Sequence, residues 1–413
     1  MIEEITKSAK NAFNKTMNAP SKTKNDVLEN IAKLLEEKRE YVFTANREDL
    51  NNAKKLLEEN KINQATYNRL KLDENKMRDM IKGLYDLIKL DDPVNNVIWT
   101  KELDKNLILK KVSTPIGIIG IIFEARPDCI IQISSLVIKS GNCAILKGGS
   151  ESIETNKALF GIIRDALKKS NYPVDTINLV YTRDDVKEML AYDKYIDLII
   201  PRGSNSLVKY IKENTKIPVL GHASGICHIF IDESAEENEV NRIVIDAKTQ
   251  YPSACNAVET ILIHKNYPYK KSLKEALEKA GVKIIDNPES YSTEYGDKIV
   301  SFKTADSINE AIEHINKFGS GHTDSILSKN NENIEKFMNN VDSASVFANC
   351  STRFSDGFRY GFGAEVGIST NKTHSRGPVG LEGLTIYKYK LYGSNNTVED
   401  YVSGKKQFSH KML

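Results

Sequence analysis

The stretch CAILKGGSESIETNKALFGIIRDALKKS, residues 143–170, changes from one periodicity to another within a single segment. It opens with four apolar residues and Lys147, a short run typical of a buried strand. Two glycines follow at 148–149, and after them apolar residues recur at the three- and four-residue spacing of a helix. The stretch therefore predicts a strand that leads directly into a helix, which is half of a βαβ unit.

The same pattern extends in both directions from this stretch. Further apolar runs flanked by helical periodicity are GIIGIIF (117–123), TINLVYT (176–182) and DLIIPRG (197–203). They predict a mostly parallel sheet. A second set predicts another α/β lobe from about residue 225: ICHIFID (226–232), ETILIH (259–264), SILSK (325–329) and SASVFAN (343–349). Residues 1–100 have helical periodicity, and a cleft is expected between the two lobes.

Composition excludes several classes of protein. The 413 residues are 40% hydrophobic and 28% charged, with a net charge of +2, which is typical of a globular chain of more than one domain. No basic field favours nucleic acid, and neither a signal peptide nor an 18-residue apolar run favours a membrane. We therefore expect a cytoplasmic protein. The five cysteines are odd in number and never in C-x-x-C spacing, so they suggest neither a disulfide framework nor a metal site.

Two glycine-bearing turns are candidates for phosphate binding. LKGGSES (146–152) and PRGSNSLVKYI (201–211) each join a predicted strand to a predicted helix. Backbone N–H groups at such a turn point toward a bound anion. Neither turn has the G-x-G-x-x-G spacing, so for each taken alone a plain structural turn is the favoured interpretation.

A single cysteine lies in YPSACNAVET, residues 251–260, without a partner thiol or an adjacent histidine. Three other cysteines, Cys129, Cys143 and Cys227, stand in apolar runs and are expected to be inert core residues. Cys255 instead has small neighbours in a predicted loop, which gives access to its thiol. If a helical turn began at Asn256, its N–H groups would favour the thiolate.

Seven segments together resemble one enzyme family. They are VSTPIGIIGIIFEARPD (112–128), AILKGGSES (144–152), PRGSNSL (201–207), YPSACNAVET (251–260), FGSGHTDSI (318–326), VDSASVFANCSTRF (341–354) and GFGAEVGISTNKTHSRGPVGLEGLTIYKY (361–389). In this order they are similar to the gamma-glutamyl phosphate reductases of the aldehyde dehydrogenase superfamily. The resemblance implies an α/β fold with a Rossmann-type NADPH-binding domain (1–102, 114–225 and 361–383), a catalytic domain (226–360) and a β-ribbon oligomerisation arm (103–113 and 384–413).

The resemblance also implies a reaction. Cys255 occupies the position of the family's nucleophile, and Cys350 is expected to be a bystander thiol. Through a cysteine thioester, L-glutamyl 5-phosphate would be reduced by NADPH to L-glutamate 5-semialdehyde. Arg126 would either stabilise the oxyanion or bind the phosphoryl group, or it would form a surface ion pair with Glu124.

Five residues are implied in cofactor binding. Lys147 matches a lysine that contacts the adenosine ribose. Ser150 replaces the glutamate of NAD-preferring relatives and so leaves room for a 2′-phosphate. The pyrophosphate side would be held by Gly203 and Ser204. Glu294 matches the glutamate that binds the nicotinamide ribose, and without the resemblance it is only a loop acid.

The substrate carries several negative charges, which arginine binds in a bidentate manner. Two segments with suitable residues, STRF and HSRGP, supply Ser351 with Arg353 and His374 with Arg376. Either arginine could instead form an ion pair that joins the domains.

One departure from the superfamily concerns thioester hydrolysis. Between residues 213 and 232 there is no acid where aldehyde dehydrogenases carry a water-activating glutamate. His222 and His228 lie in this segment, so a Cys–His hydrolase is formally conceivable, although strand alternation favours a core position for His228. A CoA-acylating dehydrogenase and a silent scaffold are further alternatives. The resemblance implies a homodimer or homotetramer and leaves open a transient contact with glutamate 5-kinase.

Overall fold

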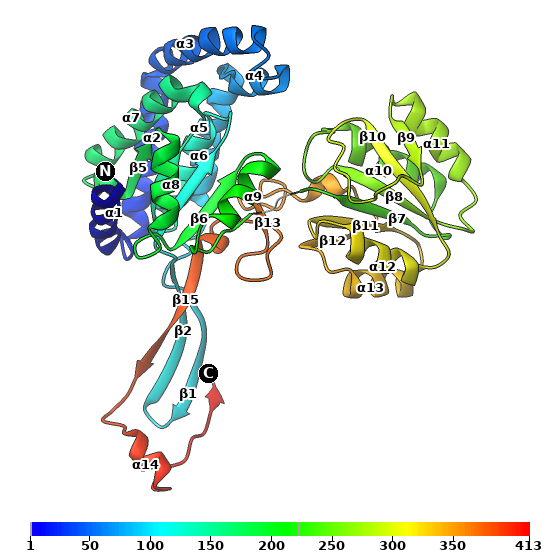
Figure 1. The fold of residues 1–413 in the computed structure, drawn as a ribbon. Coiled ribbons are helices and arrows are strands. Elements are labelled where there is room, and N and C mark those ends of the chain that lie inside the picture. Colours follow the sequence, from blue (N-terminus) through cyan, green and yellow to red (C-terminus); the bar gives the residue numbers. More distant parts are fainter. Residues whose placement is uncertain (1, 222–223) are drawn as a thin grey trace.

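Two parallel sheets and two antiparallel sheets, one of these only a pair of short strands, organise the described part of the chain (Figure 1). The structure is a computed structural model, and it describes residues 2–221 and 224–413. The first-lobe sheet has the order β5-β4-β3-β6. Its strands are β3 (Ile118–Phe123), β4 (Cys143–Lys147), β5 (Ile177–Val180) and β6 (Leu198–Arg202). All four lie within the apolar runs that the sequence predicts as strands.

Strand alternation explains why helices cover both faces of this sheet. Ile119 and Ile121 of β3 face one core, whereas Ile118 and Ile122 face the other. The helices of the lobe are α1 (Ile2–Thr16), α2 (Ser21–Glu37), α3 (Arg39–Glu58), α4 (Gln64–Leu70), α5 (Glu74–Lys89), α6 (Cys129–Lys139), α7 (Ile153–Lys169), α8 (Arg183–Ala191) and α9 (Asn205–Glu213). The first core takes residues from α2, α3 and α5–α7, and the second from α1, α8 and α9.

The second lobe is a parallel sheet with the order β12-β11-β7-β8-β10-β9. Its elements are β7 (Cys227–Ile231), α10 (Glu237–Thr249), β8 (Val258–His264), α11 (Lys270–Lys279), β9 (Lys283–Asp286), β10 (Ile299–Ala305), α12 (Ile308–Phe318), β11 (Thr323–Leu327), α13 (Asn331–Asn340) and β12 (Ser345–Ala348). The four predicted strands are confirmed, while β9 and β10 are additional. β9 is an edge strand with exposed ends, so its short sequence lacks a buried apolar run.

After β12 the chain returns to the first lobe. Its short strands β13 (Ile368–Ser369) and β14 (Gly377–Pro378) pair with each other. Val366, Val379 and Leu381 join the core against α2 and α5–α7. The two lobes are therefore connected by chain that crosses between them in both directions (Figure 1).

The arm is a four-stranded antiparallel sheet rather than a two-stranded ribbon. It comprises β1 (Val97–Asp104), β2 (Leu107–Pro115), β15 (Thr385–Tyr392) and β16 (Lys411–Met412), in the order β15-β2-β1-β16. The expected boundary at residue 103 is wrong, because β1 already pairs with β2 from Val97 onward. Asn106, with φ 59°, forms the tight turn between these strands.

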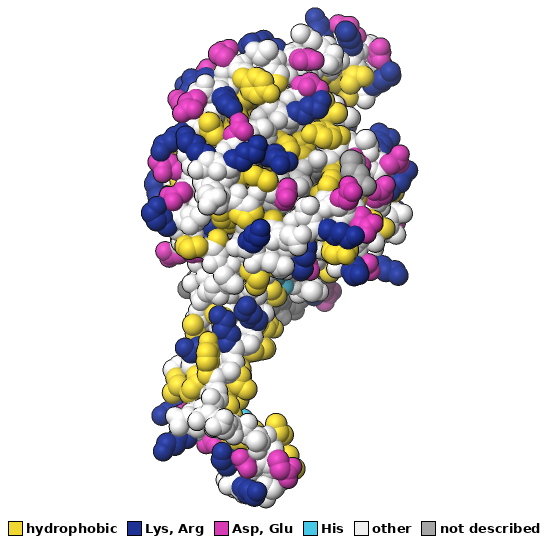
Figure 2. All heavy atoms as spheres, turned by 90° about the vertical axis from the view of Figure 1, so that its left-hand side faces the viewer, with side chains coloured by type: hydrophobic (Ala, Val, Ile, Leu, Met, Phe, Trp, Pro, Cys, Tyr) yellow, Lys and Arg dark blue, Asp and Glu magenta, His cyan; other side chains and the backbone are white. Residues whose placement is uncertain are grey.

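The arm projects from the first lobe and carries hydrophobic side chains on its surface (Figures 1 and 2). A short helix, α14 (Val398–Val402), lies near its tip. Within the described part of the chain, no helix has the length and apolar character needed to span a bilayer.

Candidate active site

Cys255 lies in the short connection between α10 and β8, and its side chain is half-buried. The connection is closed by hydrogen bonds from the Ala254 N–H to the Tyr251 carbonyl (3.1 Å) and from the Ala257 N–H to the Ala254 carbonyl (2.9 Å). The chain then enters β8 at Val258. No helical turn begins at Asn256, because the backbone goes from a turn into a strand.

The acid-free segment before β7 packs against this connection. A Cβ on Gly225 would lie 2.1 Å from the carbonyl oxygen of Cys255, so only glycine fits there. The thiol of Cys227 donates a hydrogen bond to the same carbonyl at 3.3 Å, and burial raises the pKa of that thiol well above its ordinary value. The segment that lacks a hydrolytic base thus lies directly beside Cys255.

His228, one of the two histidines of that segment, is not available as a base for Cys255. His228 is fully buried in β7, and its Nδ1 lies 3.1 Å from Oδ1 of Asp324. This confirms the predicted core position of His228. His222 lies outside the described residues.

Arg353 is a cation within electrostatic reach of Cys255. It lies in a 3₁₀ turn, Thr352–Phe354, and its side chain is buried. Its Nε donates to Oε1 of Gln250 at 3.0 Å, and its guanidinium lies 5.8 Å from the ring centroid of Tyr251. Burial lowers the pKa of Arg353, and Cys255 acts in the opposite direction, so the two groups are within electrostatic reach. Because Arg353 contacts both Gln250 and Tyr251, it lies at the connection that carries Cys255.

The first lobe contributes two more arginines to the Cys255 connection. Burial alone would raise the pKa of the Tyr251 hydroxyl, but that pKa is lowered by a hydrogen bond with Ser253 and by the charges of Arg126 and Arg69. Arg126 follows β3, and Arg69 lies in α4. Arg126 thus acts on Tyr251 in the Cys255 connection. Arg126 and Glu124, both among the described residues, form no ion pair with each other. Arg69 and Tyr251 were missed, because no local motif links residues 69 and 251.

Ser351 and Cys350 have local roles in the turn that carries Arg353. The Ser351 hydroxyl accepts a hydrogen bond from the Arg353 N–H at 3.3 Å and so caps the turn. Burial raises the pKa of the Cys350 thiol. Its carbonyl accepts a hydrogen bond from the Ser325 hydroxyl at 2.9 Å.

Arg376 is engaged between the lobes. Its Nη2 donates to the Asp342 carbonyl at 2.9 Å and lies 3.1 Å from the carboxylate of the same residue. Asp342 precedes β12 in the second lobe, whereas Arg376 precedes β14. The sequence left open whether Arg376 forms an ion pair that joins the domains, and its pair with Asp342 is of this kind. His374 lies exposed two residues before Arg376.

The turn after β4 places Lys147 and Ser150 at the edge of the first-lobe sheet. A Cβ on Gly148 would lie 2.2 Å from Nδ2 of Asn156, so the turn needs glycine there. Burial lowers the pKa of Lys147, and the positive charge of Arg183 acts in the same direction. Arg183, at the start of α8, was not predicted. The Ser150 side chain is exposed.

The turn after β6 binds an anionic oxygen supplied by the chain itself. The Ser204 N–H donates to the Glu124 carboxylate at 2.7 Å, and a Cβ on Gly203 would lie 2.4 Å from that oxygen. Ser204 also caps α9 by accepting from the Leu207 N–H. Asn205 then donates from Nδ2 to Glu294 at 3.1 Å. The turn of the first lobe and Glu294 of the second lobe therefore meet. The N–H groups of this turn are donors that fit a phosphate of a dinucleotide.

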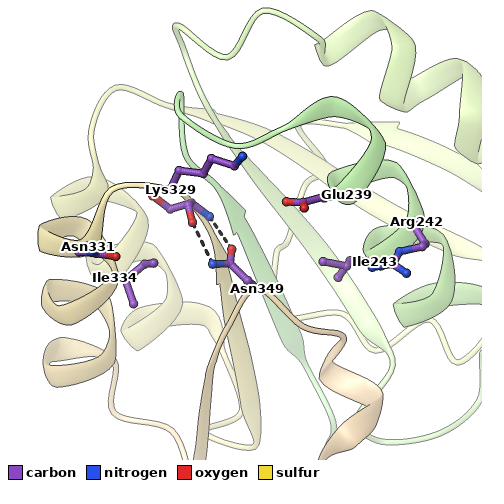
Figure 3. A pocket seen from close by; sticks show the side chains of 8 residues that line it. Glu239, Arg242, Ile243, Lys329, Asn331, Ile334 and Asn349 are labelled. Carbon is purple, nitrogen blue, oxygen red and sulfur yellow. Dashed lines mark hydrogen bonds between the residues drawn. The ribbon is translucent and has the colours of Figure 1, made fainter.

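A separate cavity of about 450 Å³ lies in the second lobe (Figure 3). It lies beyond the carboxyl ends of β11 and β12. Cys255 lies just before β8, at the opposite, amino end of the same parallel sheet. Two hydrogen bonds of 2.9 Å join Ser328 and Asn349 in the cavity wall. The Ser328 N–H donates to Oδ1 of Asn349, and Nδ2 of Asn349 donates to the Ser328 carbonyl. The cavity therefore plays no part in the Cys255 site. The residues that line it are Glu239, Arg242, Ile243, Ser328, Lys329, Asn331, Ile334 and Asn349.

Comparison with known proteins gives one consistent group of relatives. A model of the aldehyde dehydrogenase family matches residues 1–299. The gamma-glutamyl phosphate reductase of Brachyspira hyodysenteriae is 56% identical over 99% of both chains. That of Acetivibrio thermocellus is 51% identical, over 100% of this chain and 98% of the relative. The crystal structure of the Thermotoga maritima gamma-glutamyl phosphate reductase is 37% identical, with a TM-score of 0.92 over 96% of this chain and 99% of that one.

Proposed function

Because the chain belongs to the aldehyde dehydrogenase family and, within it, to the gamma-glutamyl phosphate reductases, we propose that it reduces L-glutamyl 5-phosphate to L-glutamate 5-semialdehyde. The proposed reductant is NADPH, and the proposed pathway is proline biosynthesis from glutamate. The observation that carries the proposal is a half-buried Cys255 beside Arg353 and against a segment without a hydrolytic acid.

Acyl transfer begins at Cys255. Its thiolate attacks the acyl carbon of the substrate, the bond between that carbon and the phosphate oxygen breaks, and phosphate leaves. Only a thiolate attacks readily, so a nearby cation is needed to favour that form. Arg353 supplies this charge from the same lobe, with Nε fixed by Gln250.

Two arginines have separate proposed roles toward the substrate. We assign the departing phosphate to Arg353, because its guanidinium is within electrostatic reach of the thiol. Arg126 reaches the Cys255 connection from the opposite lobe and is assigned to the tetrahedral oxyanion. One such donor contributes about 3–4 kcal/mol of transition-state stabilisation in comparable sites. Arg376 remains a predicted substrate residue that in this structure pairs with Asp342.

The residues of the first lobe fit the phosphates and ribose of NADPH. Lys147 and Arg183 would lie toward the 2′-phosphate, which the absence of a carboxylate at Ser150 permits. The pyrophosphate would be held at Gly203 and Ser204. When bound, NADPH supplies the hydride that reduces the thioester carbon. Collapse of the resulting adduct breaks the C–S bond and returns the thiolate of Cys255.

The same site disfavours hydrolysis of the thioester. An aldehyde dehydrogenase that releases a free acid needs a base to activate water. Residues 214–231 contain no carboxylate, and Gly225 of this segment contacts Cys255. Phosphate should therefore be the acceptor in the oxidative direction.

The function is tested by NADP⁺ reduction with glutamate 5-semialdehyde as substrate. We expect sustained turnover with phosphate and almost none without it, and CoA should not replace phosphate. Turnover that requires CoA would assign the protein to the acylating dehydrogenases. Phosphate-independent production of glutamate would assign it to the hydrolytic ones.

Cofactor choice is tested at Ser150. The wild-type protein should have a higher kcat/KM for NADPH than for NADH, because no carboxylate repels the 2′-phosphate. Ser150→Glu should reduce or reverse that preference. Equal use of both cofactors by the wild-type protein would contradict the role of this position.

We also propose that the arm joins subunits in a homodimer or homotetramer. Its edge strand β15 exposes Tyr389 and Leu391, each 56% accessible. An exposed apolar edge strand favours pairing with another chain.

A further inference from the structure

A buried ion pair lies beside the Cys255 connection without touching the reacting groups. Lys248, near the end of α10, and Glu259, in β8, are both fully buried, with Nζ 2.8 Å from Oε2. Burial of two charges is costly, and apolar residues of similar volume often give equal stability. The pair is therefore better explained by a role other than stability.

Glu259 has further partners in a neighbouring turn. Its Oε1 accepts a hydrogen bond from the Gly296 N–H at 3.3 Å, and the backbone of Tyr295 also donates to this carboxylate. Gly296 has φ 60°, which is the left-handed conformation of a tight turn. The hydroxyl of Tyr295 lies 2.8 Å from the Ser301 hydroxyl in β10. One carboxylate thus holds the turn that directly follows Glu294.

Glu294 in turn meets the opposite lobe. Its carboxylate accepts a hydrogen bond from Nδ2 of Asn205, which follows the Gly203–Ser204 turn. Any shift of residues 295–296 would carry Glu294 with it, because the peptide chain allows no slack over one residue. The contacts therefore connect Lys248 to Glu259, Glu259 to the turn, and the turn to Glu294.

We propose that Lys248 and Glu259 are positioning residues for the cofactor contact. Glu259 holds the turn at 295–296 so that Glu294 lies where the nicotinamide ribose binds, and Lys248 holds the carboxylate of Glu259. This inference rests on the proposed function. Glu259 follows Cys255 by only four residues. Its carboxylate therefore lies on the same short stretch of chain as the nucleophile and also holds the turn next to the cofactor contact, Glu294.

The first experiment compares Glu259→Gln with Asp92→Asn. Asp92 is the partner of another buried lysine, Lys24, at 2.7 Å in the first lobe, so both variants convert such a carboxylate to an amide. The dissociation constant of NADPH, measured by its fluorescence, should rise about tenfold in Glu259→Gln and stay unchanged in Asp92→Asn. Alkylation of Cys255 by iodoacetamide without cofactor should change by less than about twofold in either variant.

A double-mutant cycle with Glu294→Ala separates positioning from general stability. If Glu259 acts through Glu294, adding Glu259→Gln to Glu294→Ala should raise the dissociation constant of NADPH no further. The KM for NADPH should follow the same pattern. Glu259→Gln should lower the melting temperature by the same amount with and without Glu294→Ala. A structural role would give the same fold-change in both backgrounds.

Two results would overturn the inference: equal effects of Glu259→Gln with and without Glu294, or slower alkylation of Cys255 in parallel with weaker NADPH binding. Should Glu259→Gln not fold, Glu259→Asp keeps the charge beside Lys248 but shortens the reach to Gly296, and the same rise is expected. A wild-type protein that binds no NADPH would instead contradict the proposed function.

Discussion

Burial raises the pKa of Cys129, Cys227 and Cys350, and that of Cys143 to about 12. At Cys129 the charges of Arg202 and Arg126 lower the pKa, but they do not offset the loss of solvent. The side chain of Cys255 is half-buried, and Arg353 lies within its electrostatic reach. Cys255 stays the predicted nucleophile, in a setting that includes a buried arginine of the same lobe.

Replacing the nucleophile and the bystander should give opposite results. Cys255→Ala should abolish turnover, a loss of more than about 10⁴-fold, because no other group attacks the acyl carbon. Cys350→Ala removes only the sulfur and keeps the backbone carbonyl of residue 350, which accepts the hydrogen bond from the Ser325 hydroxyl. Most activity should therefore remain. The check is kcat for NADP⁺ reduction with phosphate present. Loss of activity in Cys350→Ala alone would reverse the assignment.

His314 in α12 should make stability depend on pH. Its ring is buried against His228, Tyr291 and Phe318, and burial followed by the charge of His228 lowers its pKa to about 3. Between about pH 3 and 6.5 the unfolded chain binds a proton that the folded protein does not. The free energy of unfolding should therefore fall as the pH drops below 6.5, by at most ~1.4 kcal/mol per pH unit from this group.

The variant His314→Phe removes this titration and keeps an aromatic ring. Its free energy of unfolding, from urea titrations at several pH values, should decline less steeply than that of the wild-type protein below pH 6.5. Parallel pH profiles would show that His314 is not the group responsible.

At the scale of elements, strands with strong apolar runs were predictable and weak ones were not. β3 is buried along its whole length, and the sequence GIIGIIF predicts it directly. β9 has exposed ends at the edge of its sheet, and β1 has no buried residue, so neither has the pattern of a buried strand. Each is stabilised by pairing with the strand that follows it in the chain, β10 for β9 and β2 for β1.

The arm gives a prediction at this scale. Tyr389→Lys combined with Leu391→Lys puts charge on the exposed edge of β15 and should convert the oligomer to a monomer in sedimentation velocity. Tyr41→Lys, at a residue of α3 that is 60% accessible, is the matched control and should leave the oligomer intact. A wild-type protein that sediments as a monomer would contradict the proposed role of the arm.

At the scale of the whole molecule, the site depends on contacts between the lobes. Asn205 bonds to Glu294, Arg376 to Asp342, and the first-lobe arginines reach Tyr251. Motifs could identify Cys255 and the two glycine turns, because each is local in sequence. Arg69, Tyr251 and the Lys248–Glu259 pair could not be found that way, since their roles arise only when distant segments meet.

The most direct test of the central claim is the fate of the acyl group on Cys255. The protein is incubated with glutamate 5-semialdehyde and NADP⁺ without phosphate, and its peptides are analysed by mass spectrometry. We predict one glutamyl adduct per active site on the peptide that carries Cys255, stable in water and released when phosphate is added. An adduct on Cys350, no adduct, or rapid release without phosphate would contradict a phosphate-dependent thioester mechanism at Cys255.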